Sequence, residues 1–416
     1  MGRLRGKTIA IIGGCGHVGL PLGVKLALAG AEIRLIDVNE KTVALVNEGR
    51  FPFMERDGDA QLGQALDRGL RATTDPAACR AAAVLVFVTG TPVDEHLNPK
   101  LSEVLRVFDC YEEWFEPSKL LIMRSTLFPG TMEHLRERLA RRHLGVQLAF
   151  CPERISQGRA FEEIDLLPQV VAAFDEQSFR AAFEVFAAIA PRIIRLTPLE
   201  AELTKLMANS WRYLEFAIAN QFYVIAEAHG ASFHRIFKAI KLDYPRAAAY
   251  KAPGFAAGPC LFKDTMQLAS YFDDAFTLGH AAMLVNEGLA GFVAERARQA
   301  LGGSLWGRTV GLLGMTFKPN SDDTRDSLSF KVKKLLEFDG AHVLCADPYV
   351  PACDRLERLL AEAEALVLCT PHDTYRGLEV RVPLIDVWGI LDDPPIEVWS
   401  TSEGTAQGGG SGSRTC

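Results

Sequence analysis

A cysteine near the middle of the chain is the first residue that could carry covalent chemistry. Cys260 stands in the stretch GFAAGPCLFKDT, residues 254–265, three residues before Lys263. Nearby positive charge turns a cysteine into a strong nucleophile by stabilising its thiolate, and Lys263 could supply that charge or bind a substrate. The alternative is a small buried hydrophobe, the commoner role of a free cysteine. The stretch by itself leaves both interpretations open.

A glycine-rich turn at the start of the chain predicts a dinucleotide site. Gly14, Gly16 and Gly19 form GxGxxG directly after the apolar run KTIAIIG and at the start of a helical stretch. The first glycine allows the tight turn, the second lets the backbone approach a pyrophosphate, and the third permits close helix packing. Asp37 ends the next apolar run, about 20 residues on, where a carboxylate binds the ribose and repels a 2′-phosphate. The pattern favours NAD over NADP, with an ordinary turn and a helix-capping acid as the alternative interpretation.

A thiol beside a dinucleotide suggests a four-electron oxidation. If an alcohol is oxidised to an aldehyde, Cys260 can trap that aldehyde as a thiohemiacetal. A second NAD would oxidise this adduct to a thioester, which water hydrolyses to the acid. An ordinary two-electron dehydrogenase has no use for the thiol.

The elements that must position these residues follow from the hydrophobic pattern. Short apolar runs at 83–89, 120–126, 146–152 and 169–174 alternate with helical segments, which predicts a mostly parallel, doubly wound sheet. Continuous helical spacing runs from Leu199 to about His229, and four further apolar runs, TVGLLGM, HVLCADP, ALVLCTP and PLIDVW, indicate a second α/β domain. The predicted division is an NAD-binding Rossmann domain at 1–197, a central helical region at 198–302, an α/β domain at 303–400 and a disordered Gly/Ser-rich tail at 401–416.

Composition excludes several classes of partner. The chain has 416 residues and a formal net charge of −7, which argues against nucleic acid and anionic membrane surfaces. Nine cysteines without CxxC pairs point to no metal site, and no leading apolar segment precedes the first strand. No apolar run reaches the roughly 18 residues of a membrane span. We therefore expect a cytoplasmic protein.

Several blocks together resemble the UDP-glucose/GDP-mannose dehydrogenase family of nucleotide-sugar dehydrogenases. They are GCGHVGLPLG, EGRFPFMERD, VTGTPVD, RSTLFPGT, CPERISQGRAFEEI, ELTKLMANSWRYLEFAIANQ, GPCLFKDT and LGMTFKPNSDDTRDS. They follow the family's order from Ile9 to about Asp392. The resemblance implies NAD-dependent oxidation of the C6 hydroxyl of a UDP-sugar, a C-terminal domain that binds the UDP-sugar, and a homodimer or higher homo-oligomer.

The resemblance also assigns roles to single residues. Cys260 matches the family's nucleophile, and Asp264 matches the acid that positions or activates water. Lys205 and Asn209, one helical turn apart, match the pair that stabilises oxyanion character at the reacting carbon. Two further matches are Glu153, implicated in general base work on the thioester, and Thr126, which orders the water. Taken singly, each of these could be an ordinary helix face, surface ion pair or strand-end cap.

Larger sets of binding residues follow from the same resemblance. The implied cofactor contacts are Gly14, Gly16, His17, Val18, Gly19, Asp37, Thr89, Thr91, Pro92, Ser125, Thr126, Lys263 and Arg325. The implied substrate contacts are Glu153, Arg154, Lys205, Asn209, Arg246, Phe255, Gly258, Cys260, Phe317 and Lys318. The cations suit phosphate oxygens, although solvent exposure is a credible alternative for Arg325 among its acidic neighbours.

Three departures from the UDP-glucose branch bear on the substrate. The residues before the nucleophile are Ala256, Ala257, Gly258 and Pro259 instead of Gly-Gly-Ser. IDVWGIL replaces a late Asp-x-Arg-Asn stretch and so removes a cation. CPERISQG and CTPHDTYRG are more similar to the N-acetylhexosamine branch. The substrate is therefore expected to be UDP-glucose or a UDP-N-acetylhexosamine.

Two other classes of function explain part of the sequence. A two-electron dehydrogenase of the β-hydroxyacid type would account for the glycine loop, Asp37 and Lys205, but for neither Cys260 nor the second α/β domain. A non-catalytic NAD-binding scaffold would be expected to lack one or more catalytic positions. All of those positions are present.

Overall fold

The computed structural model describes residues 4–90, 94, 100–399 and 414–415. The chain divides into two compact units. The first comprises Met1–Ser210 and Lys263–Thr277, and the second comprises Trp211–Phe262 and Leu278–Cys416. The predicted central region, 198–302, is therefore shared between the two units, because its long helices continue from one into the other. Most of the predicted tail, namely 401–413 and 416, lies outside the described residues.

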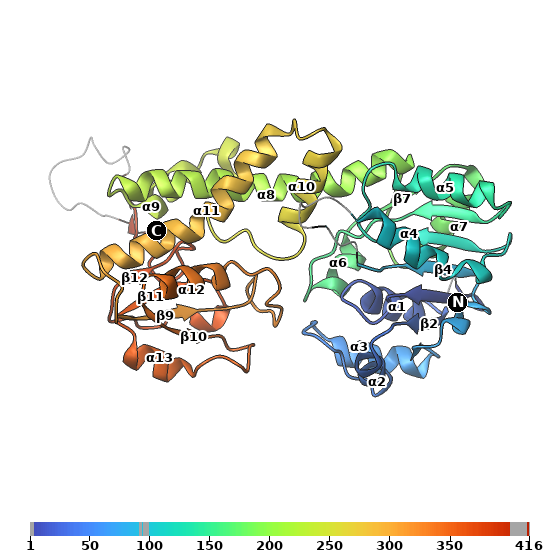
Figure 1. The fold of residues 1–416 in the computed structure, drawn as a ribbon, viewed down its shortest axis with the longest axis horizontal. Coiled ribbons are helices and arrows are strands. Elements are labelled where there is room, and N and C mark those ends of the chain that lie inside the picture. The colour runs from blue at the N-terminus through green and yellow to red at the C-terminus, as the bar shows by residue number, and fades with distance from the viewer. Residues whose placement is uncertain (1–3, 91–93, 95–99, 400–413, 416) are drawn as a thin grey trace, which may run out of the picture. The chain divides into compact units, whose positions relative to one another are not determined.

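The first unit is built on an eight-stranded sheet of order β3-β2-β1-β4-β5-β6-β7-β8 (Figure 1). Its strands are β1 Thr8–Ile12, β2 Glu32–Ile36, β3 Arg71–Thr73, β4 Val84–Phe87, β5 Leu120–Met123, β6 Gln147–Phe150, β7 Gln169–Ala173 and β8 Ile193–Leu196. Neighbouring strands are parallel except at β6 and β7. The predicted doubly wound sheet is thus confirmed. β3 and β8, which the apolar pattern did not predict, are the short strands at the two edges.

Helices cover both faces of this sheet. They are α1 Gly19–Leu28, α2 Glu40–Asn47, α3 Gly58–Asp67, α4 Leu101–Asp109, α5 Thr131–Arg141, α6 Ala160–Leu166 and α7 Glu176–Phe186, with short 3-10 turns η1 Pro76–Cys79 and η2 Glu112–Trp114. Strand β1 shows why two layers form. Ile9 and Ile11 belong to the apolar cluster that contains α1, whereas Ala10 and Ile12 belong to the cluster on the opposite face.

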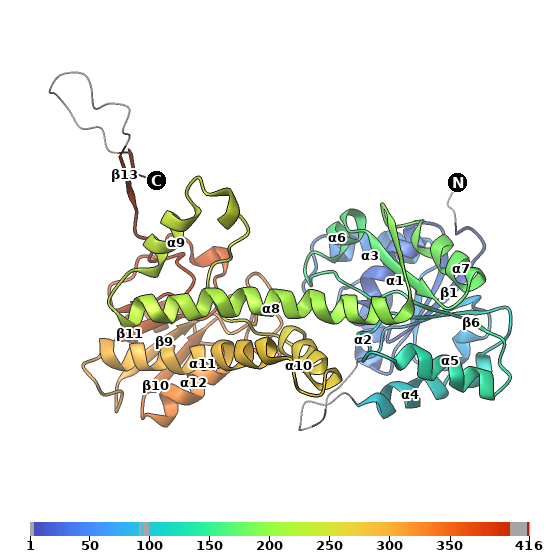
Figure 2. The ribbon, with the colours of Figure 1, turned by 90° about the horizontal axis from the view of Figure 1, so that it is seen from above.

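Three helices begin in one unit and end in the other. They are α8, Pro198–Ala228, which matches the predicted long helix, α10, Leu261–Tyr271, and α11, Thr277–Ala300, of which only the first residue, Thr277, belongs to the first unit. The second unit also contains α9 Phe233–Lys241, the turn η3 Pro245–Ala247 and the rest of α11. Within this unit α11 lies alongside the C-terminal half of α8, where Tyr223 shares a buried cluster with Leu289 and Val293 (Figure 2).

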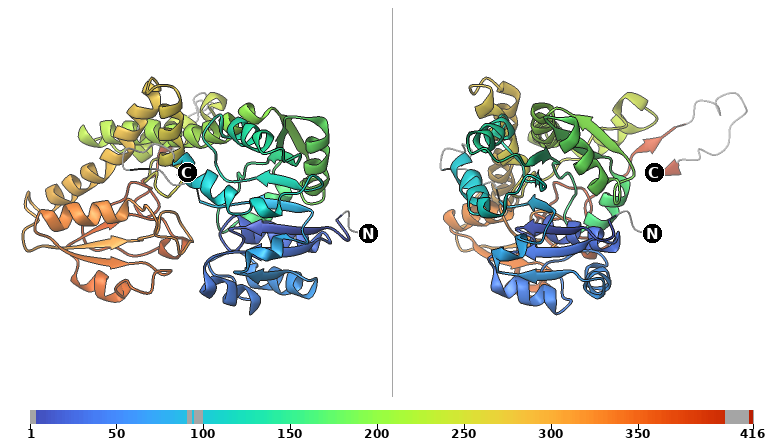
Figure 3. Two further views of the ribbon diagram at one scale, coloured as in Figure 1. Left: turned by 45° about the vertical axis from the view of Figure 1, so that its right-hand side comes forward. Right: turned by 90° about the vertical axis from the view of Figure 1, so that its right-hand side faces the viewer.

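The C-terminal sheet has the order β10-β9-β11-β12 and is parallel throughout. Its strands are β9 Thr309–Leu313, β10 His342–Ala346, β11 Ala365–Leu368 and β12 Leu384–Ile385. Helix α12, Ser329–Phe338, covers one face and α13, Leu356–Glu362, the other, with a short turn η4 at Asp373–Tyr375 (Figure 3). A separate antiparallel pair joins β13, Glu397–Val398, to β14, Arg414–Thr415. In the described part of the chain, every helix is too short or too polar to cross a membrane.

Candidate active site

The glycine loop is shaped by close backbone contacts. A Cβ atom at Gly14 would lie 2.6 Å from the Ile11 carbonyl oxygen, and one at Gly19 would lie 2.7 Å from that of Gly13. At Gly16 the nearest atom to such a Cβ is 3.7 Å away, an ordinary van der Waals distance, so a methyl group would meet no clash there. Two of the glycines are therefore required by the fold itself. Gly16 is instead available for close approach by a ligand, which is the fit that a bound pyrophosphate needs.

Asp37 closes the loop from the end of β2. Its carboxylate accepts hydrogen bonds from the backbone N–H of Cys15 and of Asn39, each at 3.1 Å. Cys15 is buried, and burial raises the pKa of its thiol to about 12, so it is inert at neutral pH. Asp37 stays half-exposed at the edge of the loop, as contact with a ribose requires.

Some of the other predicted cofactor residues of this unit lie in the same loop or at the strand ends beside it. The ring of His17 stacks on Phe53 with centroids 4.0 Å apart, and Val18 directly precedes α1. The Ser125 hydroxyl donates to the Thr89 carbonyl oxygen at 2.6 Å, joining the ends of β4 and β5. Thr91 and Pro92 lie outside the described residues. Phe53 was not predicted as a site residue, although it stands in the quoted block EGRFPFMERD.

A buried polar cluster lies where α8 meets α10 in the first unit. Asn209 donates from Nδ2 to Oδ2 of Asp264 across 2.6 Å, and both side chains are buried. Burial raises the pKa of Asp264, opposed by the charges of Lys263 and Lys205 and by the Asn209 hydrogen bond. Lys263 Nζ lies 3.8 Å from Asp264 Oδ1, too far for a hydrogen bond, and Oδ1 has no hydrogen-bond partner among the described residues. The structure thus gathers three predicted residues, Lys205, Asn209 and Lys263, around the carboxylate of a fourth, Asp264.

Glu153 has its carboxylate occupied by neighbours. Its Oε1 accepts from the backbone N–H of Arg154 and Ile155, and Oε2 pairs with the guanidinium of Arg124. Arg124 is 2% exposed and also donates to the Cys151 carbonyl and to Gln169 Oε1, both at 3.0 Å. Sequence reasoning missed Arg124, although it stands in the quoted block RSTLFPGT. The predicted base role of Glu153 stays a prediction.

Glu202 and Arg154 each hold a segment of the first unit in place through hydrogen bonds to the backbone. Thr126 follows β5 and is half-exposed, and the loop after it is anchored by Glu202 of α8. The buried carboxylate of Glu202 accepts from the backbone N–H of Gly130 at 2.7 Å and of Met132 at 2.8 Å. Arg154 donates to the Pro168 carbonyl oxygen.

In the second unit the segment that leads to Cys260, residues 254–260, packs against the loop formed by residues 316–326. We call the first of these segments the cysteine loop. The backbone N–H of Gly258 donates to the Asp326 carbonyl at 3.1 Å, and a Cβ at Gly258 would lie 2.5 Å from the Phe317 ring. Asn220 fixes the start of the cysteine loop by bonding both the N–H and the carbonyl of Gly254. Trp388, which stands in the IDVWGIL stretch that lacks the expected cation, also packs against Gly254.

Cys260 is exposed and immediately precedes α10. A helix N-terminus stabilises a thiolate, so this position suits a reactive thiol and disfavours the interpretation as a buried hydrophobe. The hydrogen bonds that Arg325 donates to the carboxylate of Asp323 are the main cause that raises the pKa of Arg325, and the charge of Cys260 adds to it. Arg325 is thus electrostatically coupled to the thiol, while its guanidinium is held by Asp323.

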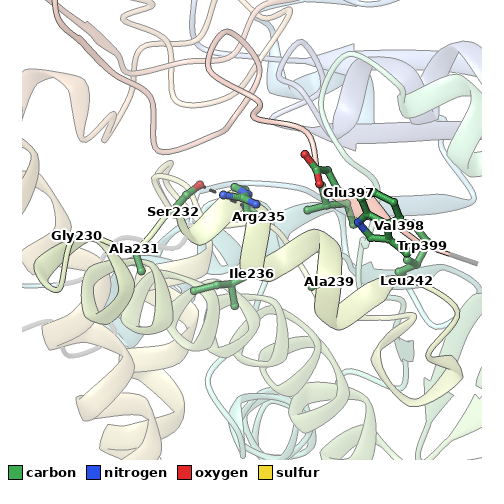
Figure 4. A pocket seen from close by; sticks show the side chains of 11 residues that line it. Gly230, Ala231, Ser232, Arg235, Ile236, Ala239, Leu242, Glu397, Val398 and Trp399 are labelled. Atoms are coloured by element: carbon green, nitrogen blue, oxygen red, sulfur yellow. Dashed lines mark hydrogen bonds between the residues drawn. The ribbon is translucent and has the colours of Figure 1, made fainter. Parts of the chain in front are cut away.

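The remaining predicted substrate residues of this unit are Phe255, Lys318 and Arg246. Phe255 is buried, and the Lys318 ammonium lies 5.9 Å from the Phe317 ring centroid. Arg246 lies exposed in η3, with its guanidinium over the Tyr244 ring at 4.8 Å. A separate groove of 910 Å³ lies between α9 and the segment around β13, lined in part by Arg235, Ile236 and Trp399 (Figure 4). No predicted site residue lines that groove. Over the described ranges, no cluster of His, Cys, Asp or Glu side chains could hold a metal ion.

A glycine loop on a doubly wound sheet, a ribose-type carboxylate and a second α/β sheet define the class of two-domain, dinucleotide-dependent dehydrogenases. Comparison with known proteins narrows this class. Three models of the UDP-glucose/GDP-mannose dehydrogenase family match the chain: its NAD binding domain at residues 7–190, its central domain at 199–288 and its UDP binding domain at 311–393. The chain belongs to this family, and it is an NAD-dependent nucleotide-sugar dehydrogenase.

Individual relatives cover almost the whole chain. The UDP-N-acetyl-D-mannosamine dehydrogenase of Methanocaldococcus jannaschii is 30% identical over 90% of this chain and 88% of its own length. Among solved structures, UDP-D-ManNAc dehydrogenase from Pyrococcus horikoshii has a TM-score of 0.87 at 27% identity, covering 94% of this chain and 97% of that one. A UDP-glucose dehydrogenase from Pyrobaculum islandicum has a TM-score of 0.86 at 27% identity, covering 93% and 95%. Both the family and the cofactor predicted from the sequence are confirmed.

Proposed function

We propose that this protein oxidises the C6 hydroxyl of a UDP-sugar to the carboxylate through a covalent adduct on Cys260. The observation that carries the proposal is the buried Asn209–Asp264 pair under the charges of Lys205 and Lys263. Asp264 stands in the first turn of the helix that Cys260 precedes. A thiol, a cationic helix face and a carboxylate with one unbonded oxygen are the groups that an alcohol-to-acid oxidation needs.

The glycine loop and Asp37 hold the cofactor. Gly16 leaves the space for the pyrophosphate, and the carboxylate of Asp37 binds the adenosine ribose. Bound NAD would accept one hydride, from the alcohol, and a second NAD molecule that replaces the NADH would accept another, from the thiohemiacetal.

Cys260 carries the covalent step. Its thiolate, stabilised by the N-terminus of α10 and by the coupled charge of Arg325, attacks the C6 aldehyde and forms the C–S bond. After loss of a hydride, the adduct is a thioester. Attack of water at the same carbon then breaks the C–S bond, and the thiolate leaves the acid product.

Lys205, Asn209 and Asp264 act on the charge and the water. The ammonium of Lys205 and the amide of Asn209 stabilise the oxyanion that forms when sulfur or water adds to the carbon. The raised pKa of Asp264 makes it a better proton acceptor than an ordinary carboxylate, and its unbonded Oδ1 can accept a hydrogen bond from water. Thr126 orders that water.

In this proposal Glu153 has two roles: it is the predicted general base, and it also holds a neighbouring segment of the chain in place. Its charge-paired carboxylate holds the 152–156 segment through the backbone N–H groups of Arg154 and Ile155. That segment carries the predicted substrate contact Arg154. The pair with Arg124 anchors it to the end of β5.

The substrate we propose is a UDP-N-acetylhexosamine, with UDP-glucose as the second candidate. The N-acetylhexosamine interpretation of CPERISQG and CTPHDTYRG agrees with the names of the M. jannaschii and P. horikoshii relatives. UDP-glucose is the second candidate because the similar P. islandicum structure is that of a UDP-glucose dehydrogenase.

The test is to incubate the purified protein with NAD and, separately, UDP-ManNAc, UDP-GlcNAc, UDP-glucose, UDP-galactose and GDP-mannose. NADH is measured by absorbance and the sugar product by mass. Two NADH per sugar with a uronate product are expected. One NADH with an aldehyde or ketone would support a two-electron dehydrogenase. If no sugar yields NADH, either the substrate lies outside this panel or the chain is a non-catalytic scaffold, and rapid, NAD-sensitive labelling of Cys260 by iodoacetamide would favour the enzyme.

We also infer self-association through the second unit. Exposed apolar side chains recur along α8 at Trp211, Ile218, Phe222 and Ile225. Their spacing places them on one side of the helix, as in helix pairs. A homodimer would bury this stripe of side chains. Sedimentation of the purified protein measures whether the chain is a dimer in solution.

A further inference from the structure

A buried histidine in the C-terminal domain has no part in the function described so far. His372 stands in CTPHDTYRG, in the segment between β11 and η4, and its side chain is fully buried. Its ring contacts the rings of Tyr349 and Tyr375, with centroid distances of 5.0 and 5.5 Å. A polar ring fixed in this way has to satisfy both of its nitrogens locally.

Both nitrogens have partners. The backbone N–H of Asn320 donates to Nδ1 at 2.9 Å, and Nε2 lies 3.1 Å from Oδ2 of Asp347. Since Nδ1 accepts, the proton of the neutral ring is on Nε2, which donates to the carboxylate. Burial acts to raise the pKa of Asp347, but the hydrogen bonds from His372 and from the backbone N–H of Met315 and Tyr349 outweigh it and hold that pKa below its ordinary value. Asp347 is therefore an ionised acceptor at neutral pH.

These contacts end on one loop. Asp347 also binds the backbone N–H of Thr316 at 3.1 Å, and the Thr316 hydroxyl bonds the Lys318 carbonyl at 3.0 Å. His372 and Asp347 thus hold the 316–326 loop at two points, Thr316 and Asn320. Between these points stand Phe317 and Lys318, which are two of the predicted substrate contacts.

The backbone of Asn320 is in the left-handed region, with φ at 54°. Asparagine adopts this conformation more readily than most other residues with a side chain, and local hydrogen bonds stabilise it there. The hydrogen bond to Nδ1 is one such restraint. A pair of contacts between the Asn320 side chain and Asp373 is another.

We propose that His372 is a positioning residue for nucleotide binding, which, as the Nε2-protonated tautomer hydrogen-bonded to Asp347, holds Asn320 so that the 316–326 loop can receive the UDP moiety. The inference rests on the proposed function, because the 316–326 loop can contact a nucleotide only if the substrate is a UDP-sugar. His372 touches neither substrate nor cofactor in this proposal. The effect also reaches the cysteine loop, since Phe317 packs on Gly258.

Two substitutions separate the two nitrogens. In His372→Asn the amide oxygen takes the place of Nδ1 and can still accept from Asn320. In His372→Gln the amide nitrogen takes the place of Nε2 and can still donate to Asp347, but nothing accepts from Asn320. UDP alone is the calorimetric probe, and KM for the UDP-sugar that the unaltered protein oxidises is measured beside it.

We expect His372→Gln to weaken UDP binding and raise KM for the UDP-sugar about tenfold, the equivalent of one hydrogen bond, with KM for NAD unchanged. His372→Asn should stay within about threefold of the unaltered protein, because one neutral hydrogen bond is retained. Hydrogen exchange at the Asn320 amide should quicken in His372→Gln only, a readout that survives if activity is lost. Equal weakening by both variants, or by neither, would overturn the inference alone. Failure of the unaltered protein to bind UDP would overturn the nucleotide site itself, and the inference with it.

Discussion

Asn209 and Asp264, 55 residues apart in the chain, meet through a 2.6 Å hydrogen bond that joins α8 to α10. The bond uses one carboxylate oxygen and leaves the other without a hydrogen-bond partner in the described structure. A buried carboxylate with one unbonded oxygen lowers stability, since desolvation favours its neutral form. We interpret that cost as the consequence of keeping an acceptor ready for water.

Asp264→Asn should therefore separate activity from stability. The variant keeps an oxygen for Asn209 but loses the proton acceptor, and kcat should fall about 10²- to 10⁴-fold. Because the folded-state pKa of Asp264 is raised, the wild-type group contributes most stability below its unfolded pKa and loses it as pH rises through the folded value. Asp264→Asn should thus have the higher Tm at pH 8, and this gain should vanish toward about pH 4. Asp67→Asn, at an exposed carboxylate of α3, is the control. A lower Tm at pH 8 would contradict this account.

Cys260→Ser should abolish formation of the acid while leaving NAD affinity near that of the unaltered protein. A serine hydroxyl is a weak nucleophile without an activating base, and loss of the covalent step should lower turnover by at least about 10³-fold. Cys110→Ser is a matched control, because Cys110 is also exposed. Product mass and NAD titration measure the two effects. Full activity of Cys260→Ser would exclude covalent catalysis.

Two glycines of the nucleotide loop should respond differently to alanine. Gly16→Ala meets no clash, so Tm should hardly change, whereas NAD should bind about tenfold or more weakly because the methyl group occupies the approach to the pyrophosphate. Gly19→Ala places its methyl group 2.7 Å from backbone atoms of Gly13 and Gly14 and should lower Tm by several degrees. Thermal unfolding and fluorescence titration with NAD distinguish them. Equal losses of stability would show that the loop does not reserve space at Gly16.

The buried ion pair of Arg124 and Glu153 should be costly to break from one side. Arg124→Met leaves the carboxylate of Glu153 buried beside two backbone N–H groups and should lower the free energy of unfolding by about 3–5 kcal/mol. Adding Glu153→Gln removes the unpaired charge and should recover part of that loss. Urea unfolding of the two single variants and the double variant measures the coupling. Additive losses would mean that the two charges do not depend on each other.

Local patterns in the sequence determined the order of elements and much of the chemistry. The apolar run KTIAIIG, the glycine turn and the spacing of Asp37 are properties of neighbouring residues. They predicted the first βαβ unit and its cofactor. Lys205 and Asn209 are four residues apart, and helix geometry places side chains at that spacing on the same face. The blocks shared with the family pointed to Cys260.

The tertiary structure decided which side chains meet. The partners Asn209 and Asp264, Arg124 and Glu153, and Asp347 and His372 are 55, 29 and 25 residues apart. Such contacts depend on which strands and helices pack together, and no local period encodes that. The short edge strands β3 and β8 escaped the hydrophobic pattern for a related reason, since pairing with a neighbouring strand, not their own composition, makes them strands. Residue types and spacing therefore determined what chemistry was available, and long-range packing decided which carboxylate would be buried, which would be paired and which would keep an oxygen for water.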